Sequence, residues 1–141
     1  MNFKNNCYSN IFILYCLVIF VCLASVTRHL DQCNVQFMHF AFRWMNCLLM
    51  REISLPLIIR VWDTYLSEES QGDGFRAYHV YVCAAFLMKF VSQLKQMDFQ
   101  EIVIFLQKLP TEKWTIKDVE TLLSQAYIYQ SWFHSSPHHL S

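Results

Sequence analysis

Apolar residues recur at helical intervals along most of this chain. In the segment 37–49 they follow the i, i+3, i+4, i+7 spacing of one helix face, at Phe37, Phe40, Ala41, Trp44, Met45, Leu48 and Leu49. Between Arg28 and Met50, Asp31 and Arg43 are the only Asp, Glu, Lys or Arg residues. A helix with so few charges is expected to be buried on most sides. The pattern therefore predicts an internal helix over 37–50.

Two further helical patterns follow, separated by the clearest loop of the chain. Ser54 is placed to cap a helix that has Pro56 in its first turn, where the missing N–H of proline does no harm. The segment 67–74, SEESQGDG, contains both glycines and a cluster of acids, which indicates a solvated connection. From Tyr78 to Lys95 apolar residues cover nearly every face. This run predicts the central helix of a bundle.

The last part of the chain carries helix start signals. Asp98 and Glu101 form a capping-box pair ahead of an apolar run that Pro110 ends. Thr115 and Asp118 repeat the same spacing before a final amphipathic segment. No useful stretch alternates with the two-residue period of a strand. The predicted fold is all-α, a helical bundle.

The first twenty-six residues differ from the rest. The run 11–26, IFILYCLVIFVCLASV, has no charge, yet at about 1.5 Å per residue it reaches only about 24 Å, short of a ~30 Å hydrocarbon core. Three interpretations stay open for this head: a variant start joined to the body, a signal or membrane anchor, or an apolar helix buried in the fold. The expected division is an apolar head at 1–26, a domain at 27–133 and a tail at 134–141.

Composition and charge exclude several functions. The formal net charge is zero, so nothing suggests nucleic acid as a partner. The six cysteines form no C-x-x-C pair and are expected to be reduced and structural. A Gly-rich phosphate loop, an H-E-x-x-H helix and a plausible catalytic triad are all missing from the sequence. We therefore predict no catalytic residue, no cofactor and no metal site.

A set of aromatic and charged residues stands inside the apolar runs of the body. Charges in such surroundings are costly unless they are paired. Two explanations stay open: ion pairs and helix caps within the fold, or direct contact with a protein partner. The residues are Arg43, Trp44, Arg51, Glu52, Arg60, Trp62 and Asp63.

These residues also carry a resemblance to a known family. The blocks FAFRWMNCLLMRE, IRVWDTYLSE, HVYVCAAFLMKF, MDFQEIVIFLQKLPTEKW and ETLLSQAY occur in the order found in the C-terminal half of a TBC domain, the fold of Rab GTPase-activating proteins. The likeness covers residues from about 27 to 140 and is strongest to the Golgi-associated subgroup. One departure is Ser54, where family members usually have proline; here the proline is Pro56. The seven residues above are then expected to be a family signature with a structural role.

The resemblance implies a Rab-type small GTPase as partner, and a location in the cytoplasm or at the Golgi membrane surface. The chain would be membrane-anchored if residues 11–26 insert into a bilayer. Family members accelerate GTP hydrolysis with an Arg from an I-x-x-D-x-x-R motif and a Gln from a Y-x-Q motif, and neither motif occurs in this sequence. We therefore expect a truncated Rab-GAP domain that is not an enzyme by itself and that exposes an apolar patch. The alternatives are a small membrane-anchored interaction protein, or an active GAP whose other half lies outside this sequence.

Overall fold

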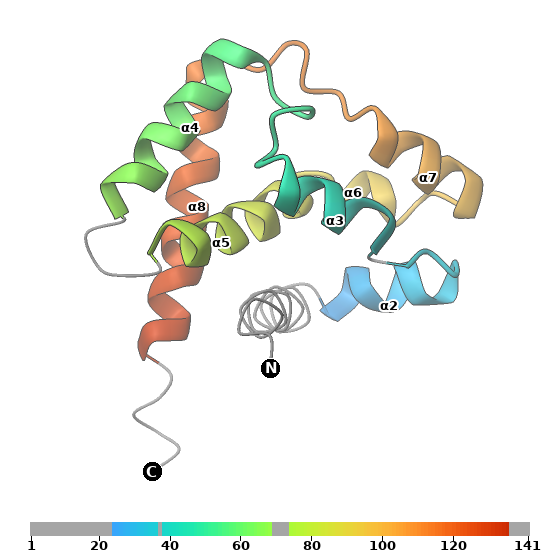
Figure 1. The fold of residues 1–141 in the computed structure, drawn as a ribbon. Helices are drawn as coiled ribbons and strands as arrows, with labels where there is room; N and C mark the ends of the chain where they lie inside the picture. Colours follow the sequence, from blue (N-terminus) through green and yellow to red (C-terminus); the bar gives the residue numbers. More distant parts are fainter. Residues whose placement is uncertain (1–23, 37, 69–73, 136–141) are drawn as a thin grey trace, which may run out of the picture.

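The computed structural model describes residues 24–36, 38–68 and 74–135, and this part of the chain is helical with no strand. The predicted all-α class is thus confirmed. Seven helices follow one another within these residues (Figure 1). They are α2 (Ala24–Gln32), α3 (Met38–Asn46), α4 (Leu55–Glu68), α5 (Gly74–Met88), α6 (Val91–Leu94), α7 (Phe99–Gln107) and α8 (Ile116–Ser135).

Helix α5 is the centre of the fold, as its apolar sequence predicts. Every residue from Tyr78 to Leu87 is buried. The helix packs most extensively against α8, and also against α4 and α3. Figure 1 shows α5 crossing α8, with α4 on one side of the molecule and α2, α3 and α7 on the other. Because all faces of α5 are covered, its apolar side chains supply much of the core.

Two predicted helices are shorter than their apolar patterns. The helix expected over 37–50 ends at Asn46, because Leu48 and Leu49 adopt left-handed backbone conformations with φ of 50° and 62°. The helix expected over 78–95 begins earlier, at Gly74, and breaks after Met88 before a short helix resumes at Val91. In both places the apolar pattern continues across a change of chain direction, so periodicity alone does not reveal the break.

The predicted start signals are present at α7 and α8. The Asp98 carboxylate accepts a hydrogen bond from the Glu101 N–H, and the Glu101 carboxylate accepts one from the Asp98 N–H, both at 2.9 Å. This is the complete capping box expected from the sequence. Before α8 the Asp118 carboxylate accepts from the backbone N–H and the hydroxyl of Thr115, and these bonds lower the pKa of Asp118. Helix α4 begins at Leu55, so Pro56 lies in its first turn as predicted.

Most of the apolar head lies outside the described residues, so its three interpretations and the predicted boundary at residue 27 stay untested predictions. Its last residues, Ala24 to Val26, form the first turn of α2, where Val26 is fully buried. Over the ranges that the structure describes, no helix combines the length and the apolar character needed to cross a membrane.

Candidate functional site

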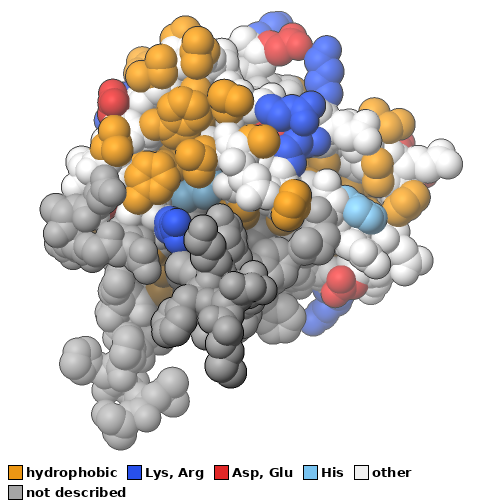
Figure 2. Space-filling view, in the orientation of Figure 1, with side chains coloured by type: hydrophobic (Ala, Val, Ile, Leu, Met, Phe, Trp, Pro, Cys, Tyr) orange, Lys and Arg blue, Asp and Glu red, His pale blue; other side chains and the backbone are white. Residues whose placement is uncertain are grey.

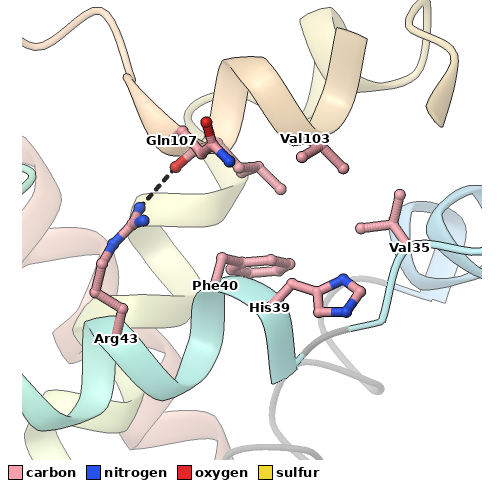
Figure 3. Close-up of a pocket in the computed structure, with 7 residues that line it drawn as sticks. Val35, His39, Phe40, Arg43, Val103 and Gln107 are labelled. Atoms are coloured by element: carbon pink, nitrogen blue, oxygen red, sulfur yellow. Dashed lines mark hydrogen bonds between the residues drawn. The ribbon is translucent and has the colours of Figure 1, made fainter. Parts of the chain in front are cut away.

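A largely buried ion pair joins α3 to the segment that follows it, and its arginine also bonds a carbonyl near the end of α7. The Arg43 Nε donates to Glu52 Oε1 at 2.7 Å, and the Arg43 Nη2 donates to the Leu106 carbonyl at 2.8 Å. Figure 3 shows the Arg43 side chain rising from α3 toward this carbonyl. The Arg43 side chain is 21% exposed and that of Glu52 only 4%. Arg43 therefore bridges three segments of the chain through charge-assisted hydrogen bonds, which are the stronger kind.

The connector between α3 and α4, residues 47–54, is tied down by further polar contacts. The Trp62 Nε1 of α4 donates to the Leu48 carbonyl at 3.1 Å. The Thr111 hydroxyl donates to the Glu52 carbonyl. These bonds hold a segment in which two leucines adopt the left-handed region, a conformation that costs about 1–2 kcal/mol for a non-glycine residue. The connector is thus a strained turn that its neighbours keep in place.

A buried histidine links α3, α4 and α5 behind this connector. The Nε2 of His79 lies 3.1 Å from the Trp44 carbonyl, and its Nδ1 lies 2.6 Å from the Tyr65 hydroxyl. A carbonyl can only accept, so Nε2 carries the proton and Nδ1 accepts from Tyr65. Burial lowers the pKa of His79 to about 4, against the weaker opposing effect of the Trp44 carbonyl, and burial raises the pKa of Tyr65. Both side chains are therefore neutral structural groups near pH 7.

Cys83 completes this cluster and is not a nucleophile. Its Sγ lies 3.5 Å from His79 Nε2, a spacing that superficially matches a Cys–His catalytic pair. The side chain is fully buried, and burial followed by the nearby Glu52 carboxylate raises the pKa of the Cys83 thiol. A catalytic cysteine needs a lowered pKa and access to substrate. Cys83 was expected from the sequence to be reduced and structural, like the other cysteines. Its contact with His79 was missed, although the i, i+4 spacing of the two residues on α5 could have indicated it.

The structure brings some of the predicted signature residues together and leaves others apart. Arg43 and Glu52 form an ion pair within the fold, one of the two explanations that the sequence left open, and Trp62 also contacts the connector. The Trp44 ring lies in the core, edge to face with Phe40 and Phe86 at centroid distances of 4.9 and 5.0 Å. The structural role of the whole signature stays a prediction.

The remaining three signature residues make none of the polar contacts that hold the connector. The Arg60 Nη1 donates to the Thr64 hydroxyl one turn along α4, at 2.5 Å. Arg51 and Asp63 are exposed. Among the described residues neither of these two has an ion-pair partner. Their charges are therefore free to meet solvent or a partner.

Two hollows lie near these residues. A cavity of about 50 Å³ separates α3 from α7 (Figure 3) and is lined by Val35, His39, Phe40, Arg43, Val103, Leu106 and Gln107. Ligand pockets for small molecules usually measure about 300–1,000 Å³, so this one is too small for a nucleotide. A wide, open groove of about 560 Å³ runs between α4 and α8, past Arg60 and Tyr127. In the described ranges no three His, Cys, Asp or Glu residues gather in a way that could hold a metal ion.

The comparisons with known proteins agree with the resemblance. A family model described as the Rab-GTPase-TBC domain matches residues 9–95, a range that begins inside the apolar head. The chain is 52% identical over 115 residues to the GTPase-activating protein gyp1 of Schizosaccharomyces pombe, and 51% identical over 116 residues to human TBC1 domain family member 22A. Each match covers 82% of this chain but only 22% of the relative.

A solved structure shares the fold. The crystal structure of the Ypt/Rab-GAP domain of Gyp1p superposes with a TM-score of 0.80 at 48% identity, covering 89% of this chain and 38% of that one. The prediction that the chain is not an enzyme is wrong in this light, since relatives are named GTPase-activating proteins and the fold is that of a Rab-GAP domain. That prediction equated two missing sequence motifs with a missing activity. The alternative of a small membrane-anchored protein gains no support.

Proposed function

Because this chain belongs to the Rab-GTPase-TBC domain family, we propose that it works in GTPase activation, as part of a fold that stimulates GTP hydrolysis by a Rab-type small GTPase. The observation that carries the proposal is the superposition on the Ypt/Rab-GAP domain of Gyp1p at 48% identity. The match spans only 22% of the length of the curated relatives and 38% of the Gyp1p domain. The activity proposed here is therefore that of a larger helical domain, to which the described residues contribute one part.

Within that assembly the described residues act as scaffold. An arginine that enters a GTPase site contributes about 10³–10⁵ in rate by stabilising transition-state charge. Arg43 is engaged by Glu52 and the Leu106 carbonyl, so reaching a phosphate would break two charge-assisted hydrogen bonds. Its role in the proposal is to hold α3 and α7 together. The proposal gives no residue in the described ranges a direct role at the nucleotide.

The test is a GTP hydrolysis assay on a panel of purified Rab proteins. The full chain is assayed alone and after co-expression with the part of the Gyp1p Rab-GAP domain that lies outside the match. We expect at least one Rab to hydrolyse GTP on the order of 10³-fold faster with the co-expressed pair than with that Gyp1p part alone. A co-purified pair that accelerates no Rab in a broad panel would overturn the proposal.

The proposal includes a location in the cytoplasm or at the Golgi membrane surface, where the subgroup that the sequence resembles acts. Fluorescence imaging of the tagged chain with a Golgi marker tests it. Carbonate extraction adds a second readout, because a peripheral protein is released and an inserted anchor is retained. Retention in the membrane pellet would contradict the location proposed here and would favour the anchor.

A further inference from the structure

A histidine and a cysteine lie together at the end of α2. Cys33 follows His29 by four residues, which places both side chains on the same side of the helix end. The Cys33 Sγ lies 3.7 Å from the His29 Nε2. The Met97 carbonyl oxygen, from the turn before α7, lies 3.0 Å from the same nitrogen and 4.0 Å from the sulfur. A nitrogen, a sulfur and an oxygen thus form one small triangle.

Backbone hydrogen bonds hold both sides of this triangle. After α2, Asn34 adopts a left-handed conformation with φ of 57°, and the Val35 N–H donates to the Leu30 carbonyl at 2.9 Å. This is the long bond of a Schellman helix end, and the buried side chains of Val35 and Leu30 anchor it in the core. On the other side, the Met97 N–H donates to the Leu94 carbonyl at 3.2 Å, and the capping box of α7 follows directly. The three donor atoms are therefore carried by well-supported backbone, as a metal site requires.

The dimensions of the triangle match one face of a tetrahedral zinc site. With a Zn–S bond of about 2.3 Å and Zn–N and Zn–O bonds of about 2.0–2.2 Å, tetrahedral geometry separates the donor atoms by about 3.4–3.6 Å. The observed separations of 3.0, 3.7 and 4.0 Å each lie within about 0.5 Å of that range. Thiolate and imidazole ligands select zinc over the hard cations Mg²⁺ and Ca²⁺, which prefer oxygen. The sequence alone predicts no metal site, because it shows the His–Cys pair without the carbonyl that completes the set.

We propose that the His29 Nε2, the Cys33 Sγ and the Met97 carbonyl bind one Zn²⁺ ion, with water in the fourth position. Since a carbonyl can only accept, the His29 Nε2 carries a proton in the structure and donates it to Met97. On binding, this proton moves to Nδ1, so that the ring stays neutral and Nε2 becomes a ligand. The Cys33 thiol proton passes to solvent, and the sulfur binds as a thiolate. One proton is released for each ion bound.

The ion would strengthen a long-range contact where the fold has few. Among the described residues, α2 makes none of the more extensive helix–helix contacts. Cys33 and Met97 are 64 residues apart in the chain, and a metal that closes so long a loop stabilises more than one that closes a short loop. The side chains of His29 and Cys33 are half-buried, so an ion can reach them from solvent. Figure 2 shows hydrophobic side chains gathered over the region of α4 and few over the region of α2.

Titration of the full chain with Co²⁺, a spectroscopic substitute for Zn²⁺, tests the site. A thiolate bound to Co²⁺ gives a charge-transfer absorption in the near ultraviolet, which binding to His138 and His139 of the tail does not produce. We expect this absorption to saturate at one Co²⁺ per chain and to disappear when Zn²⁺ is added. Cys33→Ser should abolish it, and His29→Gln should weaken Co²⁺ binding by about tenfold or more. The matched control is Cys47→Ser, which removes another half-buried free cysteine and should change neither.

Alkylation of the wild-type chain gives a second measurement that needs no variant. Saturating Zn²⁺ should slow the modification of Cys33 by about tenfold or more, because a metal-bound thiolate is shielded from the reagent. The modification of Cys47 should keep its rate, and mass spectrometry of the peptides distinguishes the two sites. Circular dichroism verifies that Cys33→Ser and His29→Gln keep the helical content of the wild-type chain.

Four results would overturn the proposal. One is the lack of any charge-transfer absorption with Co²⁺, and another is an absorption that survives in Cys33→Ser. The third is equal Co²⁺ affinity of His29→Gln and the wild-type chain, because the histidine would then not be a ligand. The fourth is saturation at one ion per two chains, which would place the ion between two copies and not against the Met97 carbonyl.

Discussion

Replacing Arg43 by methionine should destabilise the fold more than any exposed substitution. The change removes the donors to Glu52 Oε1 and to the Leu106 carbonyl. It leaves a carboxylate that is 4% exposed and whose Oε2 already lacks a hydrogen-bond partner in the described part of the chain. Breaking a buried pair by removing one partner costs about 3–5 kcal/mol, because the remaining charge is uncompensated. Domains of this size have about 5–15 kcal/mol of stability in total.

The double variant Arg43→Met/Glu52→Leu separates charge burial from loss of packing. With both charges removed, the main remaining penalty is the unsatisfied Leu106 carbonyl, about 1–3 kcal/mol. The double variant should therefore be at least as stable as Arg43→Met, and the two single changes should be coupled by about 2 kcal/mol or more. The matched control is Lys108→Ala, which breaks the exposed pair with Glu112 and should cost less than about 0.5 kcal/mol.

Urea unfolding followed by far-UV circular dichroism measures these differences, with the slope of the transition checked for each variant. Strict additivity of the two single changes would refute the reasoning, since it would show that Arg43 and Glu52 do not depend on each other. A cost below 1 kcal/mol for Arg43→Met would refute it equally.

Two further predictions concern the histidine and the connector. The pKa of His79 falls from 6.5 to about 4 on folding, so between these pH values the unfolded chain binds a proton that the folded chain does not. Stability should therefore be lost as the pH drops from 6.5 toward 4, by up to about 3 kcal/mol. Urea titrations across this pH range should show the loss, and the His79→Gln variant should show a flatter pH dependence. Leu48 has a φ of 50°, a conformation that glycine adopts more easily than alanine. The Leu48→Gly variant should therefore be about 1 kcal/mol more stable than Leu48→Ala, the reverse of the order of these two residues in a helix. Equal melting temperatures of the two variants would contradict the left-handed backbone at this position.

Local signals in the sequence predicted the parts of the fold that depend on near neighbours. The capping box at α7 needs only Asp98 and Glu101, three residues apart, and both of its bonds are present. The position of Pro56 in the first turn of α4 follows from the same short-range rules. The uniform apolar character of α5 predicted its central place, because a helix without a polar face cannot lie at the surface.

Features that depend on distant contacts could not be predicted in this way. Leucine has no preference for the left-handed region, so nothing in the run to Leu49 shows that the helix stops at Asn46. The turn is held by Trp62 and by the Arg43–Glu52 pair, which come from other segments. Buried charges need partners, and this much is evident from the sequence, but nothing local indicates that Arg43 also bonds a carbonyl 63 residues away. The missed His79 cluster likewise requires α3 and α4 to meet α5.

Because Cys83 is completely enclosed, the rate at which its thiol is modified reports how often the helices around it separate. An alkylating reagent reacts with thiolate, and this sulfur is both out of reach and held as the thiol while the helices stay packed. Cys33 and Cys47 are partly accessible and should react without any such delay. Modification of Cys83 thus requires a fluctuation that frees α5 from its neighbours, and its rate, followed by mass spectrometry in native buffer, reads out how often the bundle comes apart.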